Sequence, residues 1–358
     1  MKQLRGICYN INEPYIGRID AVHENSYILC NTEGKECLIC DKIVNFGKLF
    51  FCRNTHFNMG DIVKILPSST LIVLYDVTSS DNALFVSELC NNKCIMCPQI
   101  MKKKPSDFLQ ENLEIIDLID KSPNFLGITG GEPTSEWDSL ITIVKRITEK
   151  HPTTNIQLLT NGRAFNNENY VRELKNINDK ILYCIPLYSD IAKIHNMIVG
   201  NNKAFDQTVE GLYNLARHKL PIELRTVVTK LNYNRLEEYA HWICRNLPFI
   251  SHLAIMGMEP IYQARINIEK LWIDPYEYQN EMYNACHHLI RNNLLFFIYN
   301  HQLCVVHKEL RQYCCKTISE FKILYLDECL KCNQRDLCGG LFQTAKNFHS
   351  VAIKSIED

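Results

Sequence analysis

Residues 125–150, FLGITGGEPTSEWDSLITIVKRITEK, show the pattern that decides the fold. The apolar run FLGIT predicts a buried strand, and SLITIVKRITEK has the apolar spacing of an amphipathic helix. The same order recurs further along the chain, where NIQLLTNG precedes NENYVRELKNI, ILYCIPLYS precedes FDQTVEGLYNLARH, and IELRTVVT precedes RLEEYAHWICRNL. Repeated strand–loop–helix units predict an α/β fold with a parallel sheet, in the form of a full or partial barrel.

The chain divides into three predicted parts. Residues 1–80 carry five or so short β-branched and aromatic runs between Gly, Asn and Asp turns, which predicts a β-rich N-terminal module. Residues 81–300 form the predicted barrel. Residues 301–358 are short, rich in cysteine and weakly periodic, so we expect something other than a large core to hold them together.

The composition argues against several functional classes. Lys and Arg number 39 against 40 Asp and Glu, so no global basic field predicts nucleic-acid binding. The first ten residues, MKQLRGICYN, lack the apolar core of a signal peptide, and no apolar run is long enough to cross a membrane. We therefore expect a soluble, cytoplasmic protein. The 17 cysteines, an odd number, favour metal or redox chemistry over a disulfide framework.

Three of these cysteines follow the apolar run NALFVSEL on one predicted loop. Cys90, Cys94 and Cys97 have the spacing C-x3-C-x2-C. Three thiolates can bind three irons of a 4Fe–4S cubane and leave the fourth iron open to a small molecule. Zinc is the alternative, but a structural zinc site needs a closed set of four ligands.

A second motif, Gly130-Gly131-Glu132, lies about one strand–helix unit further on. Two glycines let the backbone approach a ligand closely, and Glu132 can pair with an ammonium group. The alternative is a purely structural role, in which the segment is a glycine-rich turn beside a surface carboxylate. The two motifs in this order favour the functional interpretation.

Together the cysteine loop and the GGE segment resemble the radical S-adenosylmethionine (SAM) superfamily. The resemblance implies that the open iron of the 4Fe–4S cluster chelates the amino and carboxylate groups of SAM. Reductive cleavage would then give a 5′-deoxyadenosyl radical that abstracts hydrogen. The matching positions also imply further SAM contacts: Met96 near the adenine, where many members have an aromatic residue, Asn161 at a strand end, Ser189 and Asp190 at the ribose, and Arg225 at the carboxylate.

Each of these contacts has a simpler alternative, because an Asn or Ser at a strand end is often only a turn residue. Arg225 is the best of them, since a charge within an apolar strand requires a partner.

The segment from Cys329 to Cys338, with Cys332 between them, reads C-x2-C-x5-C-G-G. It resembles the auxiliary-cluster modules, called SPASM or twitch, of many peptide-modifying radical SAM enzymes. The resemblance implies an auxiliary 4Fe–4S cluster. For its fourth ligand we favour Cys304, just past the last barrel strand, over the adjacent pair Cys314 and Cys315, and a missing fourth ligand would leave an iron open. Zinc is again the alternative, and either metal would help this segment to fold.

A closer resemblance covers most of the chain and is to the C-type His-Xaa-Ser system radical SAM maturases. The segments that carry it are DNALFVSELCNNKCIMC, GITGGEPT, LLTNGRAF, IPLYSDIAKIH, AFDQTVEGLYNLARH, NLPFISHLAIMGMEP, LWIDP, YNHQLC and CLKCNQRDLCGG. It implies a ribosomally made precursor peptide as substrate, with His-Xaa-Ser repeats in that family, a companion maturase and an external electron donor.

The resemblance assigns neither a catalytic side chain nor the reaction, which could be crosslinking, thioether formation or epimerisation. Two other functions stay open: a radical SAM enzyme that acts on a small metabolite or a folded protein, and a non-catalytic iron–sulfur or zinc protein. Glu132 and Arg225 favour an enzyme, because an electron carrier does not need to bind an amino acid.

Overall fold

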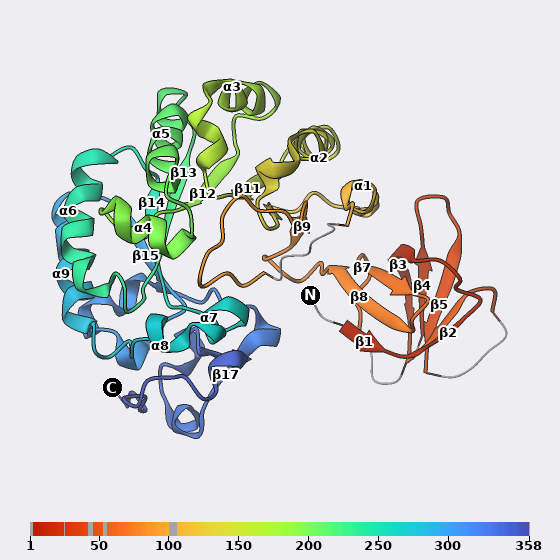
Figure 1. Ribbon diagram of the computed structural model, residues 1–358. Helices are drawn as coiled ribbons and strands as arrows, with labels where there is room; N and C mark the ends of the chain where they lie inside the picture. The colour runs from red at the N-terminus through yellow and green to blue at the C-terminus, as the bar shows by residue number, and fades with distance from the viewer. Residues whose placement is uncertain (1–2, 25, 42–45, 53–55, 100–105, 358) are drawn as a thin grey trace. The chain divides into compact units, whose positions relative to one another are not determined.

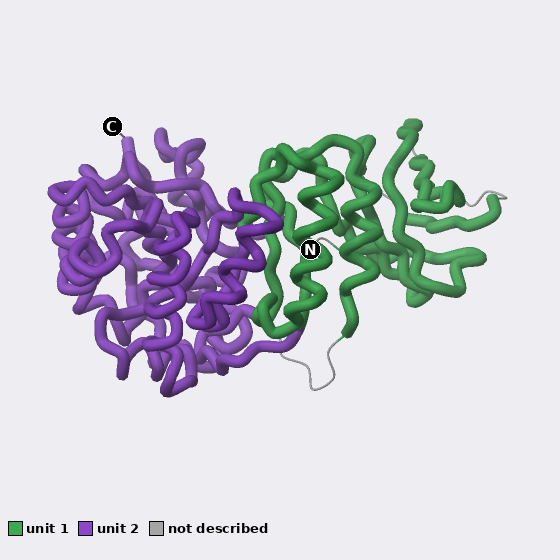
Figure 2. The backbone as a smooth tube through the Cα atoms, turned by 90° about the horizontal axis from the view of Figure 1, so that it is seen from above, with its two compact units in different colours: residues 1–87, 105–157 green, residues 88–104, 158–358 purple. Residues whose placement is uncertain are grey.

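A computed structural model describes residues 3–24, 26–41, 46–52, 56–99 and 106–357 of the chain. The chain forms two compact units (Figure 2). The first unit contains residues 1–87 and 105–157, and the second contains residues 88–104 and 158–358. The division at residues 80 and 300 that we expect from the sequence stays a prediction.

The first unit begins with an eight-stranded sheet in the order β1-β8-β7-β3-β4-β5-β6-β2. Its strands are β1 (Gln3–Arg5), β2 (Ile7–Tyr9), β3 (Tyr15–His23), β4 (Ser26–Cys30), β5 (Glu36–Cys40), β6 (Leu49–Phe51), β7 (Ile62–Leu66) and β8 (Thr70–Tyr75). Neighbouring strands are antiparallel except for β5 and β6. The β-rich module is confirmed, and its five predicted runs are β4 to β8. The apolar-run criterion missed β3, where Arg18 and Asp20 interrupt the apolar residues.

Gly6 joins β1 and β2, which are the two end strands of this order. A Cβ atom on Gly6 would lie 2.3 Å from the carbonyl oxygen of Phe51 and 2.6 Å from the ring of Phe50. Only glycine tolerates so close an approach. Because β1 pairs with β8 and β2 pairs with β6, one short segment connects the two ends of the sheet. Such closure protects strand edges from other chains.

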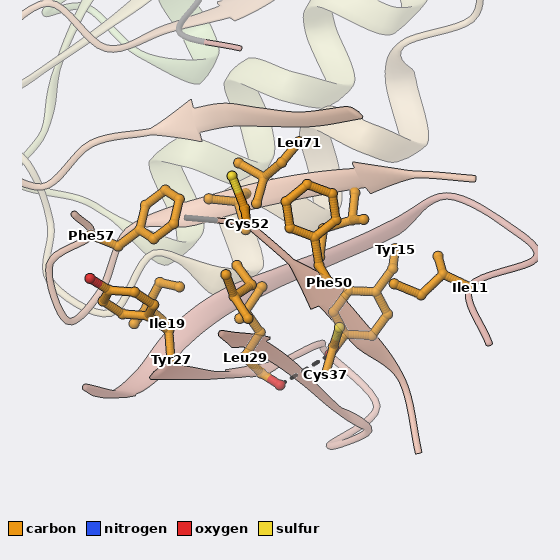
Figure 3. Packing of buried hydrophobic residues seen from close by; sticks show 13 residues of the cluster. Ile11, Tyr15, Ile19, Tyr27, Leu29, Cys37, Phe50, Cys52, Phe57 and Leu71 are labelled. Carbon is orange, nitrogen blue, oxygen red and sulfur yellow. Dashed lines mark hydrogen bonds between the residues drawn. The ribbon is translucent and has the colours of Figure 1, made fainter. Parts of the chain in front are cut away.

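A hydrophobic cluster fills this module (Figure 3). Leu29 and Phe50 are fully buried, and the rings of Tyr27 and Phe57 pack edge-on with their centroids 5.1 Å apart. The hydroxyl of Tyr15 donates to the carbonyl oxygen of Leu29 at 3.2 Å, so its polar tip is satisfied inside the core. Each large side chain buried here contributes about 1.5–3 kcal/mol to stability. The module therefore has a core of its own.

The remainder of the first unit has the α/β pattern. Strands β9 (Ala83–Phe85) and β10 (Phe125–Thr129) pair in parallel. Helices α1 (Leu109–Leu118) and α2 (Trp137–Lys150) belong to the same unit. In α2, one apolar face is buried, and Asp138 and Lys150 lie at the N- and C-terminal ends where each charge favours the helix dipole. The strand and helix predicted within residues 125–150 are confirmed.

The parallel strands continue in the second unit. The strands are β11 (Asn155–Leu159), which contains the boundary between the units, β12 (Leu182–Pro186), β13 (Ile222–Val227), β14 (His252–Met256), β15 (Phe296–Tyr299) and β16 (Cys314–Cys315). Strands β9 to β16 follow one another in the sheet in sequence order, and the pairs from β12 to β16 are all parallel. The α/β fold with a parallel sheet is confirmed. Because β9 and β16 are end strands, the barrel is partial.

Helices alternate with these strands (Figure 1). They are α3 (Glu168–Ile177), α4 (Ala192–Val199), α5 (Ala204–Arg217), α6 (Leu236–Asn246), α7 (Tyr262–Ile266), α8 (Ile268–Leu271) and α9 (Gln279–Arg291). Against the face of β12 that carries Tyr183, the ring of Phe165 packs edge-on at 5.2 Å. No helix in the described residues is long and apolar enough to span a membrane.

Beyond β16, the last segment, from residue 300 onward, contains short 3-10 turns and one small antiparallel pair. Strands β17 (Ile323–Leu324) and β18 (Leu341–Phe342) form this pair. Its hydrophobic cluster is small and contains Ile318, Phe342 and Ala345. The cysteine-rich tail that we expect from the sequence is consistent with this architecture, since little apolar surface is available to hold the segment.

Candidate functional site

The loop after β9 carries Cys90, Cys94 and Cys97, and all three side chains are partly exposed. Backbone N–H groups point at two of the sulfurs: Asn92 donates to Cys90 Sγ and Gln99 donates to Cys97 Sγ, each at 3.4 Å. Such donors stabilise a thiolate and tune a bound iron–sulfur cluster. This donor set fits a cubane held by three cysteines.

The described residues contain no group of three His, Cys, Asp or Glu side chains close enough to hold a single metal ion. A cubane does not require such a group, because each of its cysteines binds a different iron. Burial raises the pKa of Cys97, and the N–H of Gln99 partly offsets this.

Two side chains from the segment after β11, Asn161 and Arg163, hold the first half of the cysteine loop by hydrogen bonds. Arg163 Nη1 donates to the carbonyl oxygen of Asn91 at 2.8 Å and to Asn92 Oδ1 at 2.7 Å. Arg163 Nε donates to Gln207 Oε1 at 2.8 Å, which orients the guanidinium. Asn161, a predicted SAM contact, donates to Asn91 Oδ1 at 2.7 Å. In this structure Asn161 is therefore a residue that supports the loop.

The backbone of the loop also bonds to the end of α4. The N–H of Lys93 donates to Val199 O at 2.9 Å, and the N–H of Ile95 donates to Ile198 O at 3.0 Å. Gly200 follows with φ of 65°, and a Cβ atom there would lie 2.5 Å from the carbonyl oxygen of Lys93. Glycine at this position thus permits both the left-handed turn and the close contact.

Met96, the predicted adenine neighbour, is 7% exposed. It belongs to a hydrophobic cluster with Ile198 and Leu271, against which Tyr188 and Met258 also pack. Burial is the main reason why the pKa of Tyr188 is raised, and the charges of all three loop cysteines act in the same direction. Met96 thus connects the cysteine loop to the apolar interior of the second unit.

The GGE motif lies after β10 in the first unit. A Cβ atom on Gly130 would lie 2.5 Å from the carbonyl oxygen of Ser87, and the N–H of Gly131 donates to that same oxygen at 2.7 Å. Glu132 is 1% exposed, and its Oε1 accepts from the N–H and the hydroxyl of Thr134 at 3.1 and 2.7 Å. The glycines therefore serve close packing of the backbone, and the carboxylate is held in one orientation at the start of a 3-10 turn.

The predicted ribose contacts are engaged with protein groups. Ser189 Oγ accepts from the N–H of Ile191 at 3.1 Å. The carboxylate of Asp190 receives two hydrogen bonds from Arg235, at 3.1 and 2.6 Å. This bidentate pair ties the loop after β12 to the start of α6. A role of Ser189 and Asp190 in binding SAM stays a prediction.

Arg225, the predicted carboxylate partner, lies in a buried polar row across three strands. The register places Cys184 of β12, Glu223 of β13 and His252 of β14 side by side. Arg225 Nε donates to Glu223 Oε1 at 2.6 Å, and His252 Nε2 lies 3.3 Å from Glu223 Oε2. Burial would raise the pKa of Glu223, but the hydrogen bond from His252 and the charge of Arg225 lower it to about 2. Arg225 therefore has the partner that its apolar strand requires.

Comparison with known proteins identifies the architecture. Residues 84–243 match the family model of the Radical SAM superfamily. The matched segment covers somewhat less than half of the chain and includes both the cysteine loop and the GGE motif. The match implies a 4Fe–4S cluster and SAM as cofactors, in agreement with the prediction from the cysteine loop.

Two curated relatives come from Methanocaldococcus jannaschii. One is an uncharacterized protein, 28% identical over 166 residues, which are 45% of this chain and 57% of that protein. The other is named as a glycyl-radical enzyme activating enzyme, 28% identical over 94 residues, which are 24% of this chain and 25% of that protein. The chain thus matches little more than half of the first relative's length and a quarter of the second's.

Two solved structures share the fold of this chain. The anSMEcpe structure with bound AdoMet covers 76% of this chain and 91% of its own, with a TM-score of 0.54 and 14% identity. A structure of native anSMEcpe with bound AdoMet and the Kp18Cys peptide has the same coverage and identity and a TM-score of 0.53. At this identity the likeness shows the fold.

The tail brings together four predicted ligands. One pocket is lined by Cys304, Cys329, Cys332 and Cys338. Burial raises the pKa of Cys304, and the charges of Cys338 and Cys329 act in the same direction. The last residues of the chain cover this pocket, where the N–H of Ile356 donates to Cys332 Sγ at 3.4 Å.

The two other candidates for fourth ligand lie in β16. Cys314 pairs with Ile298, and Cys315 pairs with Tyr299, so the two side chains point to opposite faces of the strand. Burial raises the pKa of Cys314 to about 12, and the charge of Cys338 adds to this rise. Cys314 is thus within electrostatic range of Cys338, but neither cysteine of β16 lines the four-cysteine pocket.

Our sequence analysis missed three residues that contact the site: Arg163, Tyr188 and Glu223. A signal existed for Glu223, because it and Arg225 are charged residues two apart in an apolar strand and so share one face. For Arg163 and Tyr188 the local sequence gives no comparable signal, because their partners lie about 70 and 90 residues earlier in the chain.

Proposed function

We propose that this chain is a radical SAM enzyme that modifies a ribosomally synthesised peptide. The observation that carries the proposal is the cysteine loop, with N–H donors on two of its sulfurs and its backbone fixed by Arg163 and α4. A 4Fe–4S cluster held by Cys90, Cys94 and Cys97 would supply the electron for reductive cleavage of bound SAM, and SAM would supply the hydrogen-abstracting group.

The chain's own residues hold SAM and exclude water in this proposal. Glu132, whose carboxylate is oriented by Thr134, accepts from the ammonium group of SAM. Arg225, oriented by Glu223, pairs with the SAM carboxylate. A guanidinium has five N–H donors, and the hydrogen bond of 2.6 Å to Glu223 uses the one on Nε. Met96 supplies an apolar surface for the adenine.

The tail cysteines Cys304, Cys329, Cys332 and Cys338 would hold the auxiliary 4Fe–4S cluster. Their common pocket and the N–H donors from residues near the chain's end support this assignment. Bonds from four thiolates would also compensate for the small hydrophobic cluster of the tail. Cys304 is the proposed fourth ligand because it lines the pocket, whereas Cys314 and Cys315 do not.

A peptide substrate is the finer part of the proposal. It rests on the resemblance to His-Xaa-Ser maturases and on the fold shared with anSMEcpe, one structure of which contains a bound peptide. The precursor would carry His-Xaa-Ser repeats, and a companion maturase and an external electron donor would take part.

Deuterium transfer tests the peptide step. The reconstituted enzyme is incubated with SAM, a reductant and a precursor peptide with His-Xaa-Ser repeats that is deuterated at carbon. We expect deuterium in 5′-deoxyadenosine and a matching mass change in the peptide. Formation of 5′-deoxyadenosine without deuterium, with the peptide unchanged, would refute this substrate and leave SAM cleavage in place.

A further inference from the structure

Residues 350–357 form one wall of the four-cysteine pocket in the tail. Ile353, Lys354 and Ile356 line the pocket, and Ile356 is 7% exposed. None of residues 350–357 lies in a helix or strand, so the segment is held by its contacts with other parts of the second unit. We call residues 350–357 the strap.

The first end of the strap is anchored to the segment after α8. The N–H of Val351 donates to Asp274 Oδ2 at 3.1 Å, and Asp274 Oδ1 accepts from the N–H of Tyr276 at 2.9 Å. Ser350 is 1% exposed, and its hydroxyl oxygen accepts from the N–H of Ala352 at 3.0 Å. The strap therefore begins at a fixed point.

The other end of the strap is bonded to the 3-10 turns of the tail. The N–H of Asn333 donates to the carbonyl oxygen of Ile356, and Asn333 Nδ2 donates to that of Glu357, each at 2.9 Å. The hydroxyl of Ser355 donates to the carbonyl oxygen of Glu328 at 2.6 Å. Asn333 and Glu328 are each next to a predicted cluster ligand in the chain, so these bonds hold the strap against the auxiliary site.

Between these anchors, the backbone of the strap faces the sulfurs of two predicted ligands. The N–H of Ile356 donates to Cys332 Sγ at 3.4 Å, and the backbone N–H of Lys354 faces the thiol of Cys304. Such donors stabilise a thiolate and a bound iron–sulfur cluster. The middle of the strap thus interacts with the site that it covers.

The charged residues that line the pocket complement a loaded site. Apart from the cysteines, the charged residues in the lining described by the structure are Arg335 and Lys354, and both are cations. Four thiolates around a 4Fe–4S core carry a net negative charge, so a cation nearby favours the loaded state. Lys354 places one of the two cations on the strap itself.

The other walls of the pocket are tied to the rest of the tail and to the barrel. Leu341 belongs to the pair of strands β17 and β18, and Gln302 Nε2 donates to the carbonyl oxygen of Gly340 at 2.9 Å. The hydroxyl of Tyr325 donates to the carbonyl oxygen of Cys338 at 2.9 Å. A segment outside regular structure opens at a lower cost than paired strands do. The strap is therefore the wall whose opening gives access to the four cysteines.

We propose that the strap is the gate of the auxiliary site: it opens to admit the cluster and closes over the loaded site, which its backbone N–H groups and Lys354 stabilise. The proposal rests on the auxiliary cluster proposed above and adds how that site is loaded and closed. The strap, and not the cysteines alone, then determines how fast iron leaves the site. Loss of the hydrogen bonds of Asn333 and Ser355 speeds this release with all four cysteines in place.

Release of iron to a chelator tests the gate without turnover. The parent protein carries Cys90→Ala, Cys94→Ala and Cys97→Ala, so the iron that it retains after reconstitution, about four per chain, belongs to the tail. Excess EDTA is added under anaerobic conditions without SAM, and the loss of cluster absorbance is followed. Asn333→Ala combined with Ser355→Ala should release iron at least about tenfold faster than the parent, because two side-chain hydrogen bonds of the strap are lost.

A second variant tests the charge of the strap and leaves its hydrogen bonds in place. Lys354→Glu should speed the release by about tenfold, because it replaces a cation beside a negatively charged site by an anion. Lys354→Arg keeps the charge and should match the parent. Asn246→Ala is the matched control, since it removes a similar hydrogen bond of 2.8 Å, from Asn246 Nδ2 to the carbonyl oxygen of Trp242 in α6.

Release at the parent rate in both the Asn333→Ala/Ser355→Ala variant and Lys354→Glu would overturn the gate and leave the auxiliary site in place. Equal acceleration in Asn246→Ala would also overturn it, because the effect would then not belong to the strap. A parent protein without iron would refute the auxiliary site and the gate with it. Because the measurement uses neither SAM nor a peptide, its failure is distinct from a failure of SAM cleavage or of peptide modification.

Discussion

Replacing Arg163 by alanine tests how the cysteine loop is held. The change removes hydrogen bonds of 2.8 and 2.7 Å from the guanidinium to the carbonyl oxygen of Asn91 and the side chain of Asn92. Hydrogen bonds from a charged donor contribute about 1.5–3 kcal/mol each, and partial exposure reduces this value. We therefore expect local opening of the loop to become easier by about 1.5–3 kcal/mol, which is about ten- to a hundredfold in the opening equilibrium.

Amide hydrogen exchange in the apo protein under reducing conditions measures this opening. The amides of Lys93 and Ile95 report it, because they donate to Val199 and Ile198 across the loop. Their exchange should accelerate about ten- to a hundredfold in Arg163→Ala, while amides in β12 and β13 stay unchanged. Arg163→Lys should recover only part of the protection, because an ammonium group lacks the planar fork of donors.

Arg172→Ala is the control variant. Arg172 forms an exposed pair with Glu168 one turn away in α3, at 2.9 Å, and such pairs contribute little. Exchange at Lys93 and Ile95 should therefore match that of the unmodified chain. Unchanged exchange of these two amides in Arg163→Ala would refute the role of Arg163 in holding the loop.

The remaining predictions concern SAM binding, the tail cysteines and pH. Glu132→Ala and Arg225→Ala should each weaken SAM binding by about a hundredfold and leave the iron content unchanged, because each removes one proposed partner of the amino-acid end of SAM. Equilibrium dialysis measures the affinity, and a normal affinity for SAM in Arg225→Ala would contradict this prediction. Cys304→Ala should reduce the iron content from about eight to about four per chain, whereas Cys314→Ala should keep about eight; the opposite result would move the fourth ligand to Cys314. Burial lowers the pKa of His301 to about 4, below its ordinary value of about 6.5. The stability that the buried, neutral imidazole contributes is therefore fully present above pH ~6.5 and is lost as the pH falls towards 4. This loss should reach on the order of 3 kcal/mol in the free energy of unfolding, and an NMR titration midpoint of His301 near 6.5 would exclude it.

The fold could be predicted where an apolar run coincides with a strand. FLGIT and ILYCIPLYS became β10 and β12 because both are continuous apolar stretches whose central residues include buried side chains. Strand β3 was missed because Arg18 and Asp20 interrupt its apolar residues. These two side chains form an ion pair at 2.6 Å on the partly exposed face of the strand. The partial closure of the barrel also lies beyond local sequence, because strand order depends on long-range pairing.

The candidate site could be predicted where spacing alone carries the chemistry. Cys90, Cys94 and Cys97 are defined by a motif within eight residues. By contrast, the carboxylate of Asp190 is paired with Arg235, which is 45 residues further along the chain. No local pattern reports such a pair, and the same holds for the position of Cys304 among the tail cysteines. These placements depend on the packing of the whole second unit.

Reductive cleavage of SAM by the anaerobically reconstituted protein tests the central claim most directly. After reduction with dithionite, 5′-deoxyadenosine and methionine should form in equal amounts, because one electron breaks one carbon–sulfur bond of SAM. Cys94→Ala removes one of the three proposed ligands and should abolish both products, whereas Cys244→Ala, a cysteine of α6 outside both predicted cluster sites, should keep them. Persistence of 5′-deoxyadenosine formation in Cys94→Ala, or its absence from the unmodified protein with a full complement of iron, would contradict the account.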